Sequence, residues 1–195
     1  MSIDLQRLLA AAEAGDVNSM NKLAWIYGQG EGVPRDRAKC TYWAKRSADM
    51  GDAEGIYNHG IHHVNGDFGS PDIDAANRLW LLAAQKDYPP AMANLGLSYF
   101  HGNGFPRDLG AALTWMRKCA LADEPKGMAM VAQFYHFGLG VPTDMVEALA
   151  WYLLARGRNP NADEGIALLS SKLTPLQQAQ AKSRADELRR QVVPL

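Results

Sequence analysis

The residues best suited to chemistry in this sequence are the histidines of the run HGIHH: His59, His62 and His63. His59 and His63 are four positions apart, so on a helix they would share one face and could offer two ligands to a metal ion. A zinc site needs three or four ligands, and the nearby carboxylates of Asp67 and Asp72 do not have the spacing of a metal motif. We therefore expect packed structural histidines, with a metal-binding or enzymatic role for His59, His62 and His63 as the alternative.

The rest of the sequence lacks the usual motifs for catalysis and cofactor binding. Its Gly-x-Gly runs come at the ends of predicted helices, whereas a phosphate-binding loop opens a helix after a strand. No nucleophile elbow, HExxH or paired-cysteine metal motif occurs. The two cysteines, Cys40 and Cys119, are too few for a disulfide framework, and we expect both to be buried thiols that serve as small apolar side chains. We expect no enzyme activity, no catalytic residue, no bound metal and no cofactor.

The elements that hold these residues recur every 36 positions, from Ala12 to about Ala155. A fixed period in this range is the signature of a stacked-repeat solenoid, which offers an elongated surface to another molecule. The recurring residues are Asp36, Asp72, Asp108 and Asp144; Gly30, Gly66, Gly102 and Gly138; Tyr27, Tyr99 and Tyr135; and Trp43, Trp115 and Trp151.

Each repeat divides into two helices joined by a Gly-rich break. In the first helix, Leu23, Ala24 and Tyr27 share one face by their spacing and should enter the core. The glycines and proline of breaks such as GQGEGVPRD should end that helix, and the aspartate that follows should cap the second helix. Small residues alternate with a large aromatic one along the second helix, so we expect the recurring tryptophans in the core.

These patterns predict an all-α solenoid of antiparallel helix pairs. We assign one domain over 1–195, with about four full repeats between terminal capping helices. Thr174 should cap the last helix, and Gln177 should close its capping box. The predicted parts are a cap helix over 1–16, repeats over 17–52, 53–88, 89–124 and 125–160, and a half repeat with a final cap helix over 161–195.

The repeat motif resembles a known family. Its pattern is Leu–small–x–x–Tyr–x–x–Gly–x–Gly–Val–Pro–x–Asp, then Ala–x–x–Trp and Ala–Ala, seen over 23–48, 95–120 and 131–155 and weakened in the second repeat. It resembles the Sel-one-like repeats, a subclass of tetratricopeptide-type helical hairpins. The resemblance implies a right-handed superhelix that binds other proteins, in bacteria including secreted effectors and toxins. A cysteine-rich branch linked to β-lactam binding pairs cysteines within each repeat, and this chain lacks those pairs.

In this type of superhelix the first helix of each pair lines the concave face. The positions left there after subtraction of the core are aromatic with polar companions, which is typical of binding hot spots. Packing against an adjacent helix or a second copy of the chain is the alternative. The predicted partner-binding residues are Asn21, Trp25, Gln29, Tyr57, Ile61, Asn65, Leu97, Phe100, His101, Gln133, His136 and Phe137.

Charge and hydropathy narrow the class of partner. The net charge is −1, which argues against nucleic acid, since phosphate neutralisation needs a basic face. No run of 18 apolar residues and no signal peptide are visible, so we expect no membrane partner and a cytoplasmic location, or a periplasmic one if the sequence is trimmed. We therefore expect a non-catalytic interaction module, a bacterial adaptor or regulatory scaffold. An immunity or chaperone-type protein that sequesters a toxin or effector is the alternative, and self-association is possible.

Overall fold

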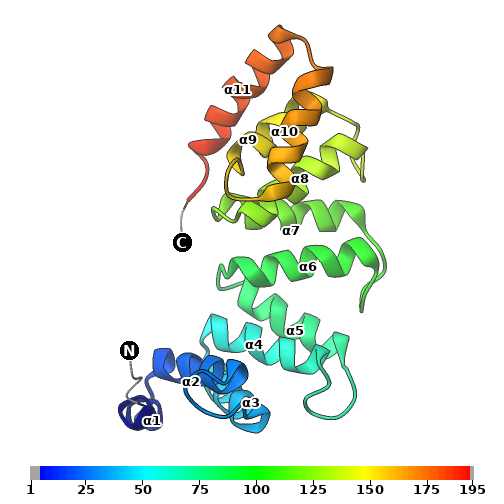
Figure 1. Cartoon of the computed structure of the whole chain (residues 1–195). Helices are drawn as coiled ribbons and strands as arrows, with labels where there is room; N and C mark the ends of the chain where they lie inside the picture. Colours follow the sequence, from blue (N-terminus) through cyan, green and yellow to red (C-terminus); the bar gives the residue numbers. More distant parts are fainter. Residues whose placement is uncertain (1–4, 194–195) are drawn as a thin grey trace. The chain divides into compact units, whose positions relative to one another are not determined.

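A computed structural model describes residues 5–193, and within that range every regular element is an α-helix (Figure 1). The predicted all-α class is therefore confirmed. The helices are α1 (Leu5–Glu13), α2 (Val17–Gln29), α3 (Arg37–Asp49), α4 (Ala53–Val64), α5 (Ile73–Ala84), α6 (Pro89–His101), α7 (Leu109–Leu121), α8 (Pro125–Phe137), α9 (Met145–Leu154), α10 (Pro160–Lys172) and α11 (Pro175–Arg189).

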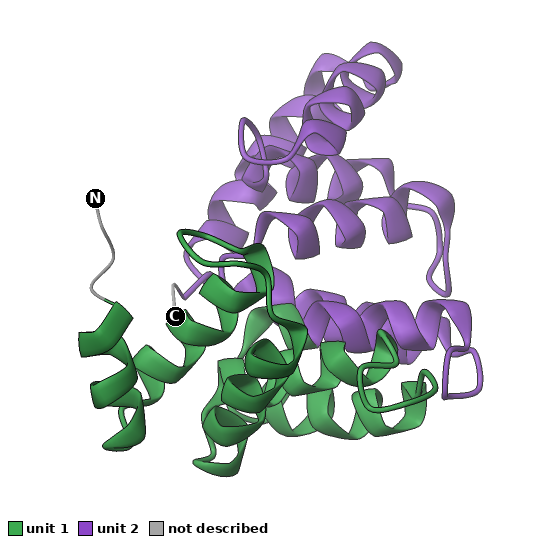
Figure 2. Cartoon of the chain, turned by 60° about the horizontal axis from the view of Figure 1, so that its bottom comes forward, with its two compact units in different colours: residues 1–91 green, residues 92–195 purple. Residues whose placement is uncertain are grey.

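Two compact units divide the chain, one up to Ala91 and the other from Met92 (Figure 2). In the first unit each of the helices α1 to α5 packs on the next. In the second, α7, α8 and α9 pack in the same consecutive manner, and α9 also contacts α10 and α11. The helix predicted over 1–16 corresponds to α1, and its residues 1–4 lie outside the described range. None of the described helices has the length and apolar character needed to cross a bilayer.

The predicted aspartate caps are present at the start of all four second helices. Asp36, Asp72, Asp108 and Asp144 are in extended conformation, and each accepts a hydrogen bond from a backbone N–H of the following turn. Such a cap contributes about 1 kcal/mol, because it satisfies a donor that the helix itself cannot pair. At α11 the predicted capping box forms, with Thr174 and Gln177 bonded reciprocally.

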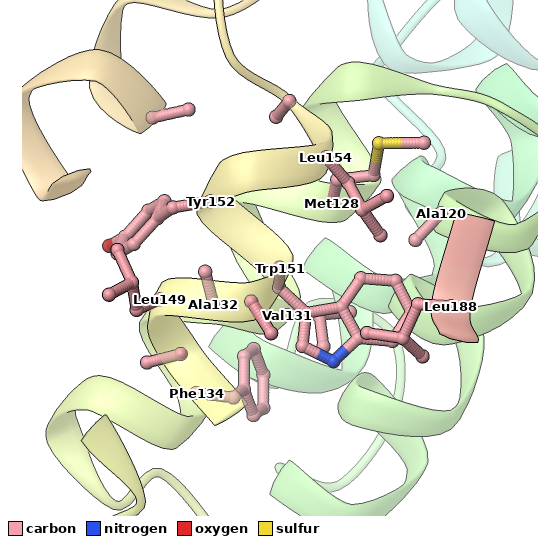
Figure 3. Close-up of a cluster of buried hydrophobic side chains, with 14 of the residues drawn as sticks. Ala120, Met128, Val131, Ala132, Phe134, Leu149, Trp151, Tyr152, Leu154 and Leu188 are labelled. Carbon is pink, nitrogen blue, oxygen red and sulfur yellow. The ribbon is translucent and has the colours of Figure 1, made fainter. Parts of the chain in front are cut away.

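The core of the second unit surrounds Trp151, which is fully buried together with Val131 and Phe134 (Figure 3). In the first unit, Leu23, Ala24, Tyr27 and Trp43 form a corresponding buried cluster. These residues confirm the predicted core faces. The expectation was wrong for Trp115, which is half-buried and carries the Lys118 ammonium 4.4 Å above its ring. In the third repeat the indole of Trp115 is therefore partly exposed to solvent, and the Lys118 ammonium covers one of its faces.

Helix backbones approach most closely at small residues. A Cβ atom added to Gly55 of α4 would lie 2.4 Å from Ser47 Oγ and 2.7 Å from the backbone nitrogen of Ala48 on α3. A Cβ atom added to Gly127 of α8 would lie 2.7 Å from the backbone nitrogen of Ala120 on α7. The two glycines occupy the same repeat position, so the same close approach recurs in both units.

We predict that Gly55→Ala destabilises the protein by about 1–3 kcal/mol, because the added methyl group must push α3 and α4 apart. Gly110→Ala, on the exposed face of α7, is the matched control, since a Cβ atom there would lie 3.3 Å from Asp108 Oδ1 and would meet no backbone atom of a neighbouring helix. Alanine normally favours a helix over glycine by about 1 kcal/mol, so that variant should be neutral or more stable. Urea unfolding measures both. Equal or greater stability of Gly55→Ala would contradict the close approach.

Candidate functional site

The structure places the predicted partner-binding residues in three different environments. Trp25 and Phe137 are the most exposed large side chains among them, at 54% and 63%. Asn21 and His136 are buried. The exposed group also contains Gln29, Asn65 and His101, and the half-buried group contains Tyr57, Ile61, Leu97, Phe100 and Gln133.

Several of these side chains are committed to packing. Leu97 and Phe100 lie against the buried cluster of the second unit, and the Phe100 ring meets Phe134 edge-on at 5.7 Å. His136 stacks on Phe137 with 4.3 Å between ring centroids. Leu97 and Phe100 therefore make contacts of the kind expected if these positions pack within the protein. Trp25 and Phe137 present the largest apolar surfaces to solvent.

Trp25 lines a small pocket in the first unit. The pocket has a volume of about 290 Å³ and is lined by Asn18, Asn21, Lys22, Trp25 and Glu54. The Asn21 amide nitrogen donates to Asp52 Oδ2 at 2.8 Å and to Glu54 Oε2 at 3.4 Å. Because both acceptors are carboxylates, this orientation of the amide is set by chemistry.

The carbonyl oxygen of the same Asn21 amide lacks a hydrogen-bond donor among the described residues. Asn21 Oδ1 is buried and accepts no hydrogen bond from the residues that the structure describes. An unpaired buried carbonyl costs about 1–3 kcal/mol, which a donor from a binding partner would relieve. Burial, with repulsion from Asp52, raises the pKa of the Glu54 carboxyl. The pocket therefore combines an aromatic surface, the amide of Asn21 and a carboxyl group.

The three candidate metal ligands of the second repeat do not converge. The His59 and His63 rings are 5.1 Å apart, and both pack on Phe68, at 5.3 and 4.8 Å. His62 is directed to other partners, Asp67 and Cys40. Over residues 5–193 no group of three or more His, Cys, Asp or Glu side chains is placed to hold a metal ion. Asp72, one of the two carboxylates considered as a further metal ligand, instead caps helix α5.

His62 instead belongs to a chain of polar contacts that the sequence did not reveal. Its Nδ1 lies 2.6 Å from Asp67 Oδ2, and its Nε2 lies 3.6 Å from Cys40 Sγ. The Asp67 side chain is 2% exposed, and its Oδ1 meets Arg37 Nε at 3.0 Å in an ion pair. The expectation for Cys119 is confirmed, since it is fully buried, but Cys40 is only partly buried and contacts a histidine. A single sequence offers no signal for this contact, because Cys40 and His62 come from different repeats.

The repeated helical hairpins and their capped second helices define an α-solenoid of the tetratricopeptide-like class. The Sel1 repeat model matches residues 17–52, 53–88, 89–123 and 125–156, and the chain belongs to the Sel1 repeat family. Proteins of this family are generally protein-interaction modules, and their fold typically serves as a non-catalytic scaffold.

Solved structures with this fold include three informative neighbours. A protective antigen of uropathogenic Escherichia coli strains, displaying an SLR fold, is 30% identical over 96% of this chain, with a TM-score of 0.86. This chain spans only 41% of that protein. A Sel1 repeat protein from Oxalobacter formigenes is 21% identical, with 96% and 78% of the two chains covered and a TM-score of 0.76. An immunity protein from Pseudomonas aeruginosa is 17% identical, with coverages of 98% and 76% and a TM-score of 0.58. No curated protein matches.

The histidine cluster makes stability sensitive to acid. Burial, followed by repulsion from His63, lowers the pKa of His59 below 6.5. Lys45 and His62 act in the same direction, and Asp49 opposes them. Burial, with Lys172, also lowers the pKa of His136.

We predict that the melting temperature falls as the pH decreases from 7.5 to 5.5. Because the folded protein binds fewer protons than the unfolded chain, this stability is present above pH 6.5 and is lost below it. His59→Leu, which restores the residue type found at Leu23 and Leu95, should reduce the loss. Thermal unfolding followed by circular dichroism measures this. An equal loss in wild type and variant would exclude His59 as a contributor.

Proposed function

We propose that this protein is an adaptor or regulatory scaffold that binds a segment of another protein against the first helices of its repeats. Membership of the Sel1 repeat family supports the general role, and the pocket beside Trp25 supports the location. The observation that carries the proposal is the combination of the exposed Trp25 indole with the buried, unsatisfied carbonyl oxygen of Asn21.

The pocket is suited to an extended segment with an apolar side chain and a nearby N–H donor. The apolar side chain would cover the indole of Trp25, and tryptophan is among the residues that contribute most to binding at protein interfaces. The donor would pair with Asn21 Oδ1, which has no competing partner in the described part of the chain. A backbone N–H or a lysine ammonium fits this role, and the carboxyl group of Glu54 favours the cation.

An immunity-type role, in which the partner is a toxin, is a narrower form of the same proposal. Its support is the immunity protein from Pseudomonas aeruginosa. At 17% identity, that protein is similar to this chain in fold alone. The partner's identity separates the two forms. A toxin whose activity is inhibited in the complex would establish the immunity role, whereas a partner that stays active would favour the scaffold.

We predict that Trp25→Ala weakens partner binding about 30-fold, corresponding to about 2 kcal/mol for a tryptophan hot spot. The partner is first identified by affinity purification of the native complex and mass spectrometry, then purified and titrated by calorimetry. Tyr42→Ala is the matched control, because Tyr42 is equally exposed (52%) but lies on the second helix of the same repeat. A folded Trp25→Ala variant with wild-type affinity would refute this location, and a larger loss for Tyr42→Ala would move the interface to the second helices.

A further inference from the structure

The contact of Cys40 with His62 and Asp67 is absent from the equivalent positions of the later repeats. The position of Arg37 is occupied by Ile73, Leu109 and Met145 in the following repeats, and that of Cys40 by Ala76, Ala112 and Ala148. His62 corresponds to Ile26, Ser98 and Phe134, and Asp67 to Glu31, Asn103 and Leu139. In the second unit the equivalent residues Leu109, Ala112, Phe134 and Leu139 all belong to the apolar cluster or pack against it. The boundary between the third and fourth repeats is therefore built from apolar residues, so packing does not require polar groups between the first two repeats.

The three side chains form an ordered relay. The Asp67 carboxylate, 2% exposed, lies 2.6 Å from His62 Nδ1, which places it to accept from Nδ1–H. That tautomer leaves Nε2 as an acceptor, and Nε2 lies 3.6 Å from Cys40 Sγ, within the range of a sulfur hydrogen bond. A nucleophile beside a base, with the base oriented by a third group, is the arrangement that activates a thiol.

The relay opens into a pocket of about 430 Å³. Gly28 lies directly against the sulfur, since a Cβ atom there would be 3.1 Å from Cys40 Sγ. The other lining residues include the amides of Gln29 and Asn65 and two arginines. Arg35 is held by a 2.6 Å bond from its Nε to the Gly28 carbonyl, and Arg37 forms an ion pair with Asp67. A small molecule with a carboxylate or phosphate group fits this composition, because arginine pairs well with both.

We propose that Cys40, His62 and Asp67 form a covalent thiol site that accepts an acyl group from a small anionic ester or thioester. Cys40 Sγ attacks the acyl carbon while His62 Nε2 takes the thiol proton. A carbon–sulfur bond forms as the bond to the leaving group breaks, and His62 passes the proton to the departing alkoxide or thiolate. The products are S-acylated Cys40 and one alcohol or thiol, so the step requires no oxidant. This site goes beyond the proposed partner binding, and its pocket shares no lining residue with the pocket beside Trp25.

The charges around the sulfur define the role of each group. Burial, then the Asp67 carboxylate, raises the pKa of the Cys40 thiol, and Arg35 and Arg37 oppose this rise. The resting sulfur is therefore protonated at neutral pH, and attack depends on a base rather than on a preformed thiolate. His62 is that base, and Asp67 acts through it as a positioning residue.

The test uses the full chain with Cys119→Ala, which leaves Cys40 as its one thiol. Alanine occupies the position of Cys119 in other repeats, at Ala83 and Ala155, so folding should persist. The probes are the mono-4-nitrophenyl ester of glutaric acid, which is anionic, and 4-nitrophenyl acetate, which is neutral. Intact-mass spectrometry should show one glutaryl group on Cys40, formed about tenfold faster than the acetyl group. Cys40→Ala, the residue of the later repeats, should show none.

Two further variants distinguish proton transfer from a structural effect. At pH 7, His62→Gln should slow acylation on the order of 100-fold, and Asp67→Asn at least about tenfold. At alkaline pH, solvent removes the thiol proton, so the rates of both variants should approach that of the parent. Circular dichroism checks folding. The proposal is overturned if Cys40 acquires no acyl group, if His62→Gln reacts at the parent rate at pH 7, or if its rate deficit is the same at every pH.

Discussion

The close approach of consecutive helices at small residues is the constraint on which the repeat depends. Gly55 and Gly127 occupy one repeat position, and at each a missing side chain lets the backbone of the preceding helix come into contact. Larger residues on the same helix then pack at a fixed distance from the preceding helix, as the fully buried Val131 does four positions after Gly127. Because each contact involves neighbouring helices alone, a local change in residue type stays local, and the structure tolerates individual repeats that differ from the others.

The second repeat differs most from the common pattern. His59 and His63 stand where the other repeats have an apolar residue and a tyrosine, and an aromatic cluster with Phe68 replaces the usual packing. At the boundary with the first repeat, His62 and Asp67 face Cys40. The histidines of α4 thus have two different environments. His59 and His63 pack against the Phe68 ring, whereas His62 is oriented by the buried Asp67 carboxylate.

Features governed by local rules could be predicted from the sequence. The aspartate caps follow from the unpaired N–H groups at a helix start, and the core faces follow from helical spacing, so Asp36 and Leu23 were placed correctly. Predictions that required knowledge of a neighbour were less successful. Cys40 was expected among apolar side chains, because the sequence does not state which side chain of another helix lies opposite it.

The sequence by itself determined the all-α repeat, its 36-residue period and the type of residue at each cap and core position, because these depend on backbone hydrogen bonding and helical periodicity within one repeat. The tertiary structure alone decided which exceptions to the repeat meet. It set the Asn21 amide against Asp52 and Glu54, and it brought His62 and Asp67 to Cys40, which is 22 positions from His62. These contacts depend on the packing of one helix on the next, which adds a distance and a direction that no spacing along the chain contains.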